Sequence, residues 1–290
     1  MSKLSYTETV EIIDKRQRKF EEPSQKEVDD MIDDDEAQID EEAEREEERD
    51  YQQSVANDKS PIYGNLRVEH KPEDTMRFLS VNINGLAFWW HNNPKADHLK
   101  FILKHYQIDG LGLQEPCINW CAFKSSITLA SLLRDGTTPI KSVHSHNLHE
   151  TDNIGRKQRG GTATLLRDEL AARVIDRGWD ETRLGRWSWY RIQGEPGWRT
   201  RIVTAYAPTG NKQSDFGSYY KQIHRYIQKK GLRTNPKAMF REDLCRELRH
   251  WRSLGDQVLL MMDANENVLE GAMVKKMAKP DMGLRAAVHS

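Results

Sequence analysis

Apolar and polar residues alternate in blocks from about residue 75 to residue 267, and the blocks predict strands and helices in turn. Residues 76–83 (MRFLSVNI) and 108–115 (IDGLGLQE) are predicted strands. Between them, residues 94–106 have helical spacing, and Pro94 is well placed to start the helix. A strand, helix, strand unit usually makes a parallel pair, so both strands should end at the same edge of a sheet.

The middle of the chain predicts mainly strands, and two helices follow it. The predicted strands are 139–146, 160–167, 186–192 and 200–208, and the predicted helices are about 217–230 and 239–252. GEPG at 194–197 predicts a hairpin turn, and Gly255 should end the second helix. The apolar run Val258–Met262 predicts a strand buried on both faces of an α/β protein.

Composition restricts the class of protein. The 290 residues are 37% hydrophobic and 31% charged, which supports a core inside a soluble protein. No stretch approaches the roughly 18 apolar residues of a membrane span, so a membrane is not an expected partner. Three cysteines do not make a disulfide framework, and the N-terminus lacks a signal-peptide pattern. We therefore expect an intracellular protein.

Charge divides the chain unevenly. Residues 29–50 hold 14 acids and two arginines, which leaves a net charge of +11 on residues 51–290. We expect residues 1–74 to form a disordered, strongly acidic leader and residues 75–290 to form the domain. A basic body with an acidic tail is common in chains that bind a polyanion, but the tail itself is better explained as a solubilising segment. KRQRK at 15–19 suggests nuclear import or the solvated face of a short helix.

Polar side chains stand where four predicted strands end. They are Asn82 and Asn84 in SVNINGL, Glu115 in GLQEP, Tyr206 in TAYAPTG, and Asp263 and Asn265 in MMDANEN. Mg²⁺ prefers carboxylate and amide oxygens plus several waters, so Glu115 with Asn84 is the candidate metal site. Asp263 and Asn265 could orient a nucleophile, and Tyr206 could donate to a phosphate. The set suits metal-assisted attack of water on a phosphodiester, although Asp and Asn also favour plain turns.

Five motifs in order resemble the endonuclease/exonuclease/phosphatase family, whose fold is that of deoxyribonuclease I. They are SVNINGL, LQEP, GGTATLL, TAYAPTG and MDANEN, between about residues 76 and 267. The resemblance implies a four-layer α/β sandwich of two mixed β-sheets flanked by helices. It also implies cleavage of phosphate esters with Mg²⁺ or Mn²⁺. SVNINGL and MDANEN are most similar to the nuclease domains of non-LTR retrotransposons, which implies DNA as the partner and a nuclear location.

The resemblance assigns a role to each polar residue at the strand ends. Asn82 matches an Asn that supports the active-site network, and Glu115 matches the metal-binding Glu. Tyr206 matches a Tyr that contacts the scissile phosphate. Asp263 matches the acid that aligns or activates the water, and Asn265 matches an amide that holds phosphate. The position of Asn84, the second candidate metal ligand, is Asp in abasic-site nucleases and often Asn in retrotransposon nucleases.

Four further residues are candidates for substrate binding. Arg156, Lys157 and Arg159 belong to RKQRGG, and the resemblance implies that this loop lies near the substrate groove. A merely solvated basic loop is an equal alternative. Thr209 stands where many abasic-site enzymes have Asn, which weakens its assignment.

The resemblance also implies two blocks beyond MDANEN that the sequence lacks. The family has a late-strand Asp and an Asp-His or Asn-His pair, whereas His289 is the only histidine in the 25 residues after Asn265 and has no acid beside it. We therefore expect a domain that is truncated at its C-terminus and has little activity as written, since one positioned acid or base contributes about 10²–10⁴-fold.

Other interpretations remain open at this stage. A phosphatase of the same fold and a non-catalytic remnant that binds nucleic acid are the alternatives to a DNA endonuclease. Metal binding by the histidines of HSHNLHE and zinc binding by the cysteine pair are weaker hypotheses, and the paired tryptophans more simply belong to the core. These residues are His144, His146 and His149, Cys117 and Cys121, and Trp187 and Trp189.

Overall fold

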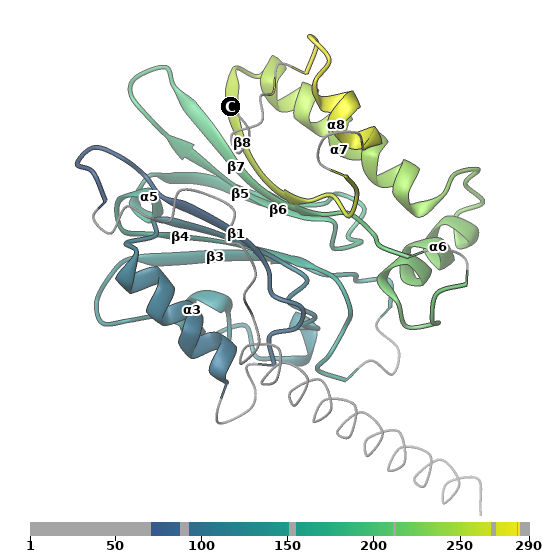
Figure 1. Ribbon diagram of the computed structural model, residues 1–290, viewed down its shortest axis with the longest axis horizontal. Coiled ribbons are helices and arrows are strands. Elements are labelled where there is room, and N and C mark those ends of the chain that lie inside the picture. Colours follow the sequence, from purple (N-terminus) through teal and green to yellow (C-terminus); the bar gives the residue numbers. More distant parts are fainter. Residues whose placement is uncertain are drawn as a thin grey trace, which may run out of the picture. The chain divides into compact units, whose positions relative to one another are not determined.

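Two four-stranded sheets form the centre of the folded part (Figure 1). The computed structural model describes residues 71–87, 93–150, 155–210, 213–267, 271–282 and 284. Of the predicted acidic leader, only residues 71–74 are among them. The KRQRK segment and His289 lie outside the described residues, and the predictions made for them stay predictions.

The first sheet has the strand order β1-β2-β4-β3. Its strands are β1 (Phe78–Asn82), β2 (Gly110–Gln114), β3 (Ile140–Ser145) and β4 (Thr162–Arg167). β1 and β2 are parallel and are joined through helix α3 (Pro94–His105), which confirms the predicted strand, helix, strand unit. The other two pairings are antiparallel, so the sheet is mixed. Asn82 stands opposite Gln114, and both parallel strands therefore end at one edge.

The second sheet has the strand order β5-β6-β7-β8. Its strands are β5 (Val174–Trp179), β6 (Trp187–Gln193), β7 (Arg199–Tyr206) and β8 (Asp256–Asp263). β6 and β7 form the predicted hairpin, which the hydrogen bond from Gly194 N to Trp198 O closes at 2.9 Å. β7 and β8 are parallel with Tyr206 opposite Asp263, so this mixed sheet also gathers polar residues at one edge.

Helices cover the outer faces of both sheets and complete four layers (Figure 1). Among the described residues, the helices of two turns or more are α3, α6 (Tyr219–Lys229) and α7 (Pro236–Ser253). Leu99 and Leu103 of α3 pack on the first sheet, and Phe240 and Leu248 of α7 pack on the second. A separate core fills the space between the sheets, with Tyr190, Ile202 and Leu166 among its members. The predicted four-layer sandwich of two mixed sheets is confirmed.

Several elements differ from the sequence prediction. β5 and four short helices were not predicted: η1 (Trp120–Ala122), α4 (Leu129–Leu133), α5 (Asp168–Ala172) and α8 (Ala272–Met277). The prediction that Val258–Met262 is buried on both faces is wrong, because only Met261 in this run is fully buried. Within the part of the chain that the structure describes, β8 pairs only with β7 and holds an edge position, which leaves its side chains half-buried. Gly255 ends α7 with a φ of 81°, as predicted.

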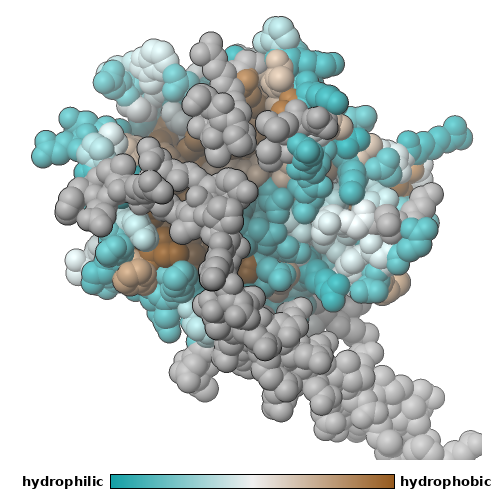
Figure 2. All heavy atoms as spheres, viewed as in Figure 1, coloured by the Kyte–Doolittle hydropathy of each residue, from teal (hydrophilic) through white to brown (hydrophobic). Residues whose placement is uncertain are grey.

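Hydrophobic side chains gather toward the middle of the face shown in Figure 2, and hydrophilic side chains dominate its rim. This distribution agrees with cores that lie between layers. No helix in the described ranges combines the length and the apolar character that a membrane crossing requires.

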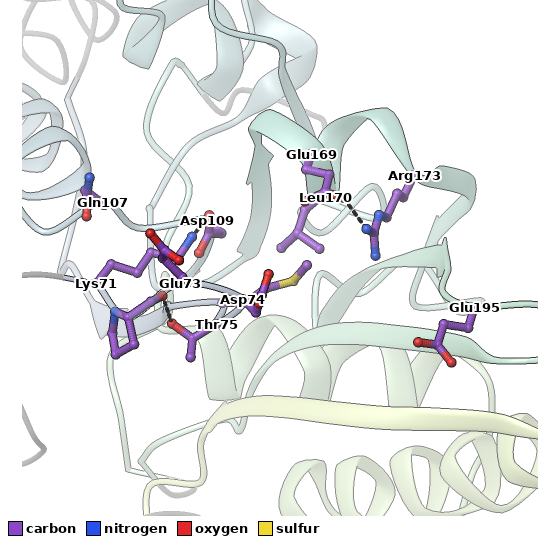
Figure 3. Close-up of a pocket in the computed structure, with 12 residues that line it drawn as sticks. Lys71, Glu73, Asp74, Thr75, Gln107, Asp109, Glu169, Leu170, Arg173 and Glu195 are labelled. Atoms are coloured by element: carbon purple, nitrogen blue, oxygen red, sulfur yellow. Dashed lines mark hydrogen bonds and ion pairs between the residues drawn. The ribbon is translucent and has the colours of Figure 1, made fainter.

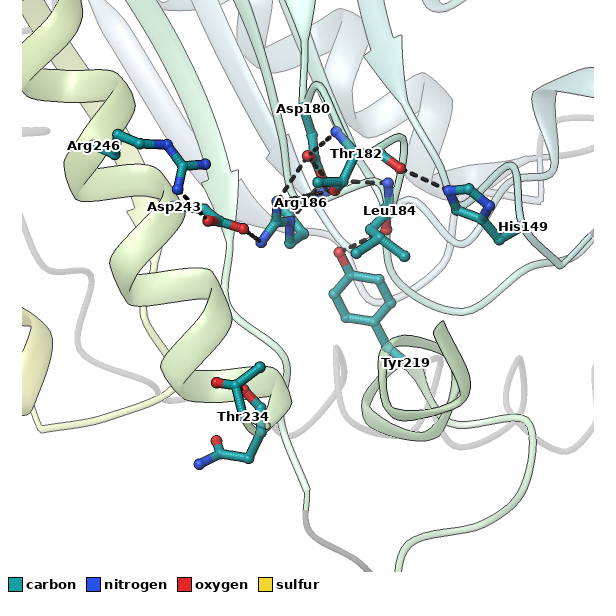
Figure 4. Close-up of polar contacts among 10 residues, drawn as sticks. His149, Asp180, Thr182, Leu184, Arg186, Tyr219, Thr234, Asp243 and Arg246 are labelled. Atoms are coloured by element: carbon teal, nitrogen blue, oxygen red, sulfur yellow. Dashed lines mark hydrogen bonds and ion pairs between the residues drawn. The ribbon is translucent and has the colours of Figure 1, made fainter. Parts of the chain in front are cut away.

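A buried ionic network connects the second sheet to α7 (Figure 4). The Arg186 side chain is 1% exposed, and its Nε donates to Asp180 Oδ2 at 2.7 Å. Its Nη1 donates to Asp243 Oδ2 of α7, also at 2.7 Å. Burial by itself lowers the pKa of Arg186, but the two carboxylates reverse this and raise it. For Asp180, burial by itself raises the pKa, because it disfavours the charged carboxylate. The charge and hydrogen bonds of Arg186 outweigh this effect, and the pKa of Asp180 lies below its usual value. Arg186 and Asp180 are therefore both charged in the folded protein.

Replacing Arg186 by Met should destabilise the protein by about 3–5 kcal/mol, because two buried carboxylates would lose their common partner. The matched control is Arg246→Ala. Arg246 also pairs with Asp243, but its side chain is 63% exposed, so its loss should cost less than about 1 kcal/mol. Urea unfolding of the three proteins at neutral pH measures both changes. Similar losses for the two variants would contradict the importance of burial here.

His144 and His146 are half-buried on and just after β3. The His144 ring stacks on Trp120 with 4.2 Å between centroids and lies 6.3 Å from the His146 ring. Burial, followed by the charges of His146 and Arg177, lowers the pKa of His144 to about 4. Burial and then Arg183 lower the pKa of His146 to about 4 as well. Both imidazoles are therefore neutral at pH 7.

Acid should destabilise the fold through this pair. A histidine in the unfolded chain binds a proton below about pH 6.5, whereas His144 and His146 in the folded protein stay neutral until about pH 4. The contribution of each is complete above pH 6.5 and is lost as the pH falls toward 4, by up to about 3 kcal/mol per histidine. Urea unfolding across this range should show a shallower fall for His144→Gln/His146→Gln than for wild type. His105→Gln, on an exposed face of α3, should keep the wild-type slope.

Candidate active site

One amide connects the carboxylates at the polar edges of the two sheets. Asn82 Nδ2, at the end of β1, donates to Glu115 Oε2 at 3.0 Å and to Asp263 Oδ2 at 2.8 Å. Glu115 directly follows β2, and Asp263 is the last residue of β8, 181 positions from Asn82. The fold thus brings together three residues that the sequence proposed for one site.

Asn82 and Asp263 are fixed by the same kind of turn. Asn82 Oδ1 accepts a hydrogen bond from Asn84 N at 2.9 Å, and Asp263 Oδ1 accepts one from Asn265 N at 3.0 Å. These are Asx turns, in which a side chain binds the backbone two residues later. Asn84 and Asn265 have positive φ values of 43° and 49°, which asparagine tolerates well. Asn82 and Asp263 therefore serve both as turn residues and as candidate site residues. Each uses its Oδ1 atom in the turn and its other polar atom, Nδ2 or Oδ2, in the site.

Glu115 has a strained backbone. Its φ is 56°, in the left-handed region that a glutamate rarely adopts. Two neighbouring segments hold it there: Glu115 N donates to Gly161 O at 3.1 Å, and Glu115 O accepts from Gly85 N at 2.8 Å. Such strain costs on the order of 1–3 kcal/mol and gathers at functional sites. The conformation aims the carboxylate at Asn82.

Tyr206 contributes a buried hydroxyl next to these carboxylates. The residue is 1% exposed, and its hydroxyl hydrogen-bonds to the side chains of Glu115 and Asn265. Burial first, and then the negative charge of Glu115, raise the pKa of Tyr206 far above the usual 10. The hydroxyl therefore keeps its proton and acts as a donor. Asn265 Nδ2 also donates to Ala207 O at 2.7 Å, which joins β8 to the segment after β7.

The residues present suit a hard cation with few protein ligands. No cluster of three or more His, Cys, Asp or Glu side chains converges anywhere in the described ranges, so a cation here has at most two carboxylates. Mg²⁺ accepts this arrangement, because it commonly binds one or two carboxylates and fills its octahedron with waters and substrate oxygens. Glu115 and Asp263 already share one hydrogen-bond donor and offer such a pair. Asn84 is exposed in the adjoining turn.

The basic loop runs beside the segment that follows Glu115. Asn119 N donates to Arg156 O at 2.9 Å, and Lys157 forms a β-bridge with Ile118. Arg156 and Arg159 are exposed and Lys157 is half-buried. The loop thus extends the β2–β4 pairing beyond the polar edge, on the side of the candidate site. Thr209 is exposed two residues after Ala207.

Two residues of this region were missed in the sequence. Lys95 Nζ donates to the carbonyls of Ile83, Asn84 and Gly85 at 2.7–3.1 Å and so holds the turn that carries Asn84. A lysine in the first turn of a helix opposes the helix dipole, and this unfavourable placement was a signal. Tyr219 stacks on Tyr206 with 5.4 Å between centroids, but nothing in its local sequence indicates the contact.

The structure separates the other candidates. His149 lies against Tyr226 and the Thr182 carbonyl, 2.7 Å from its Nε2, so HSHNLHE does not converge on a metal. Cys117 is buried and Cys121 is exposed, with no metal-binding cluster at either in the described chain. Trp187 packs against Phe240, as predicted for a core residue, and Trp189 lies against Trp251.

A hollow of about 630 Å³ lies at the opposite edge of the first sheet (Figure 3). Residues that precede β1 and β2 line it, whereas the candidate site follows these strands. Its lining includes five carboxylates but only one lysine and one arginine: Glu73, Asp74, Asp109, Glu169 and Glu195 against Lys71 and Arg173. Such a surface repels phosphate, so the hollow is not the place for a phosphate ester.

No family model matches the sequence, and no curated protein matches it. Solved structures of similar fold include the catalytic domain of human Nocturnin with a bound sulfate anion, at a TM-score of 0.46 and 15% identity over 73% of this chain and 71% of that one. A 3′ phosphatase from Neisseria, bound to a product DNA hairpin, has a TM-score of 0.41 and 16% identity. An AP endonuclease from Archaeoglobus fulgidus has a TM-score of 0.41 and 14% identity. The chain covers 58% of each of the last two, with 66% of its own length.

Replacing Tyr206 by Phe should leave the tyrosinate absorbance gained near pH 10 unchanged in the folded protein, because Tyr206 does not ionise there. In urea the protein is unfolded and Tyr206 ionises like any other tyrosine. The absorbance that the variant gains near pH 10 should then be smaller than that of wild type by the contribution of one tyrosinate. A pH titration at 295 nm of both proteins, folded and unfolded, measures the difference. A missing tyrosinate in the folded variant would show that Glu115 and burial do not hold the proton.

Proposed function

We propose that this protein is a Mg²⁺-dependent phosphodiester hydrolase that acts on DNA, with an endonuclease domain of the mobile-element type. One observation carries the proposal: Asn82 joins Glu115 and Asp263 where the polar edges of the two sheets meet. Two carboxylates held together beside a protonated phenol are suited to a metal-bound phosphate. The mobile-element assignment is supported by the resemblance of SVNINGL and MDANEN alone.

Each residue of the site has a proposed task. Glu115 would hold Mg²⁺, which when bound neutralises phosphate charge and makes a water more acidic. Asp263 accepts the proton of the attacking water, since its Oδ2 faces the site and its Oδ1 is fixed in the Asx turn. When a phosphate is bound, Tyr206 turns its one hydroxyl hydrogen from Glu115 to a phosphate oxygen. Asn82 keeps both carboxylates in place and adds no charge.

Charge supports DNA as the substrate. Residues 51–290 carry a net charge of +11, and Arg156, Lys157 and Arg159 lie in the loop that extends from the polar edge. Cations in such a loop bind backbone phosphates without reading the base sequence. A DNA substrate agrees with the nuclear location that KRQRK suggests.

An activated diester tests the site most directly. Bis(4-nitrophenyl) phosphate releases 4-nitrophenolate, which leaves without being protonated, so its hydrolysis requires the metal and the water but no general acid. We expect Mg²⁺-dependent release of 4-nitrophenolate. Nicking of supercoiled plasmid should be far weaker, because the alkoxide that leaves from DNA departs slowly unless a general acid protonates it. Preference for the monoester 4-nitrophenyl phosphate would instead identify a phosphatase. Absence of Mg²⁺-dependent hydrolysis of either ester would overturn the proposal.

Replacing Glu115 by Gln should reduce this hydrolysis by more than about 100-fold, because the amide keeps the shape but loses the charge that a hard cation needs. The thermal unfolding midpoint should stay close to that of wild type, since the substitution is isosteric. Glu169→Gln is the matched control, because Glu169 is exposed in the hollow at the opposite edge. Equal rates for Glu115→Gln and wild type would remove Glu115 from the metal site.

A further inference from the structure

Phe216 is the most exposed of the large hydrophobic side chains in the described ranges, at 76%. It lies in the connection between β7 and α6, among the polar residues Ser214, Asp215 and Ser218. Exposing a phenyl ring to water is unfavourable, and neither neighbour of Phe216 in the chain, Asp215 or Gly217, is an apolar side chain that could cover it. An isolated ring on a polar surface is a poor site for an apolar protein partner, which needs a larger contiguous area.

The ring is held in place from one side. The guanidinium of Arg225 lies 3.9 Å from the ring centroid, and Arg225 Nη1 donates to Phe216 O at 2.7 Å. Glu150 fixes that guanidinium with two hydrogen bonds, from Nε at 2.7 Å and from Nη2 at 2.6 Å. The phenyl ring is therefore already ordered, and binding a flat ligand against it costs little conformational entropy.

A buried glutamine connects the Phe216 segment to the basic loop. Gln222 is 4% exposed, and its Nε2 donates to Arg159 O at 3.3 Å and to Gly217 O at 3.1 Å. The Arg159 side chain also reaches Asp215, with 3.8 Å between the charged atoms. This ion pair is exposed and weak, so a phosphate can replace the aspartate. The loop cations and the phenyl ring thus belong to one continuous surface.

The same surface leads to the candidate active site. Gly160, in the basic loop, packs so closely on Tyr219 that a Cβ atom there would lie 2.4 Å from the tyrosine ring. Tyr219 in turn stacks on Tyr206. The base of the Phe216 segment, the basic loop and the site tyrosine are therefore packed together.

We propose that Phe216 is a stacking platform for an unpaired nucleobase of single-stranded DNA, whose neighbouring phosphates bind Arg159 and the rest of the basic loop. Every base offers a flat face to an aromatic ring, and its backbone offers the negative charge that the loop attracts. The Arg225 guanidinium covers one face of the ring, and the ring is 76% exposed, so its other face stays available to a base. The proposal takes DNA from the proposed function but does not require hydrolysis.

Binding without metal tests the platform. Fluorescence anisotropy of a labelled 12-residue oligo(dT) with EDTA at low salt gives the Kd of the full chain. Phe216→Ala should raise this Kd by about 5- to 100-fold, the loss typical of one stacked base. Phe216→Trp should bind at least as well as wild type, whereas Phe216→Leu should resemble Phe216→Ala, because leucine keeps apolar area but has no ring.

Two controls separate stacking from a general surface effect. A fully paired duplex of 12 base pairs offers no free base, so its Kd should change less than about twofold in Phe216→Ala. Phe101→Ala removes another exposed ring, 56% exposed on α3, and should leave the oligo(dT) Kd unchanged. No binding of oligo(dT) by wild type, or equal effects of Phe216→Ala on both DNA forms, would overturn the platform. So would wild-type affinity in Phe216→Leu.

The two proposals fail separately. Loss of oligo(dT) affinity in Phe216→Ala without any Mg²⁺-dependent hydrolysis by wild type would keep the platform and reject the hydrolase. Hydrolysis of bis(4-nitrophenyl) phosphate by wild type, together with an unchanged oligo(dT) Kd in Phe216→Ala, would keep the hydrolase and reject the platform. The small diester carries no base to stack, so its hydrolysis does not depend on Phe216.

Discussion

The hydrogen bonds of the Asn82 amide are the constraint on which the candidate site depends. Two carboxylates close together repel each other, and the Nδ2 hydrogens of Asn82 are what they share. The amide oxygen is used as well, since it accepts from Asn84 N. An aspartate at this position would add a third negative charge and provide no donor. The side chain must therefore be neutral, branched and able to donate twice, which is the chemistry of asparagine.

The bridge requires a fixed spacing between the two sheets, and buried hydroxyls provide it. Thr164 Oγ1 of the first sheet donates to Thr204 Oγ1 of the second at 2.8 Å and lies 3.0 Å from Ser188 Oγ. Gly112 permits this approach, because a Cβ atom there would lie 2.8 Å from the Thr204 hydroxyl. Arg186 then fixes the start of β6, and its carbonyl accepts from Tyr206 N at 2.9 Å. Polar contacts inside the core thus determine where the edge residues meet.

Local patterns predicted the strands and helices with strong periodicity and missed those without it. β5 escaped because Asp176 and Arg177 interrupt its pattern, and Ile175 on this edge strand is 51% exposed. The residues of the candidate site could be predicted because each lies at the last position of a strand or within two residues after it. The ionic network could not, since its partners are far apart in sequence and a buried charge contradicts the pattern: Asp243 lies 57 positions from Arg186. Phe216 was missed for a related reason, because exposure depends on tertiary packing.

The two ends of the first sheet carry opposite charge, so a polyanion that approaches the domain would be drawn to one end and away from the other. Carboxylates dominate the hollow in front of β1 and β2, and the cations of the basic loop lie beyond their far ends. A phosphate backbone is therefore repelled from one edge and attracted to the other before any specific contact forms. The bridged carboxylates stand at the attractive edge, although they are negative themselves. A divalent cation between phosphate and carboxylate would resolve that conflict, which is a physical reason for the proposed hydrolase to need a metal.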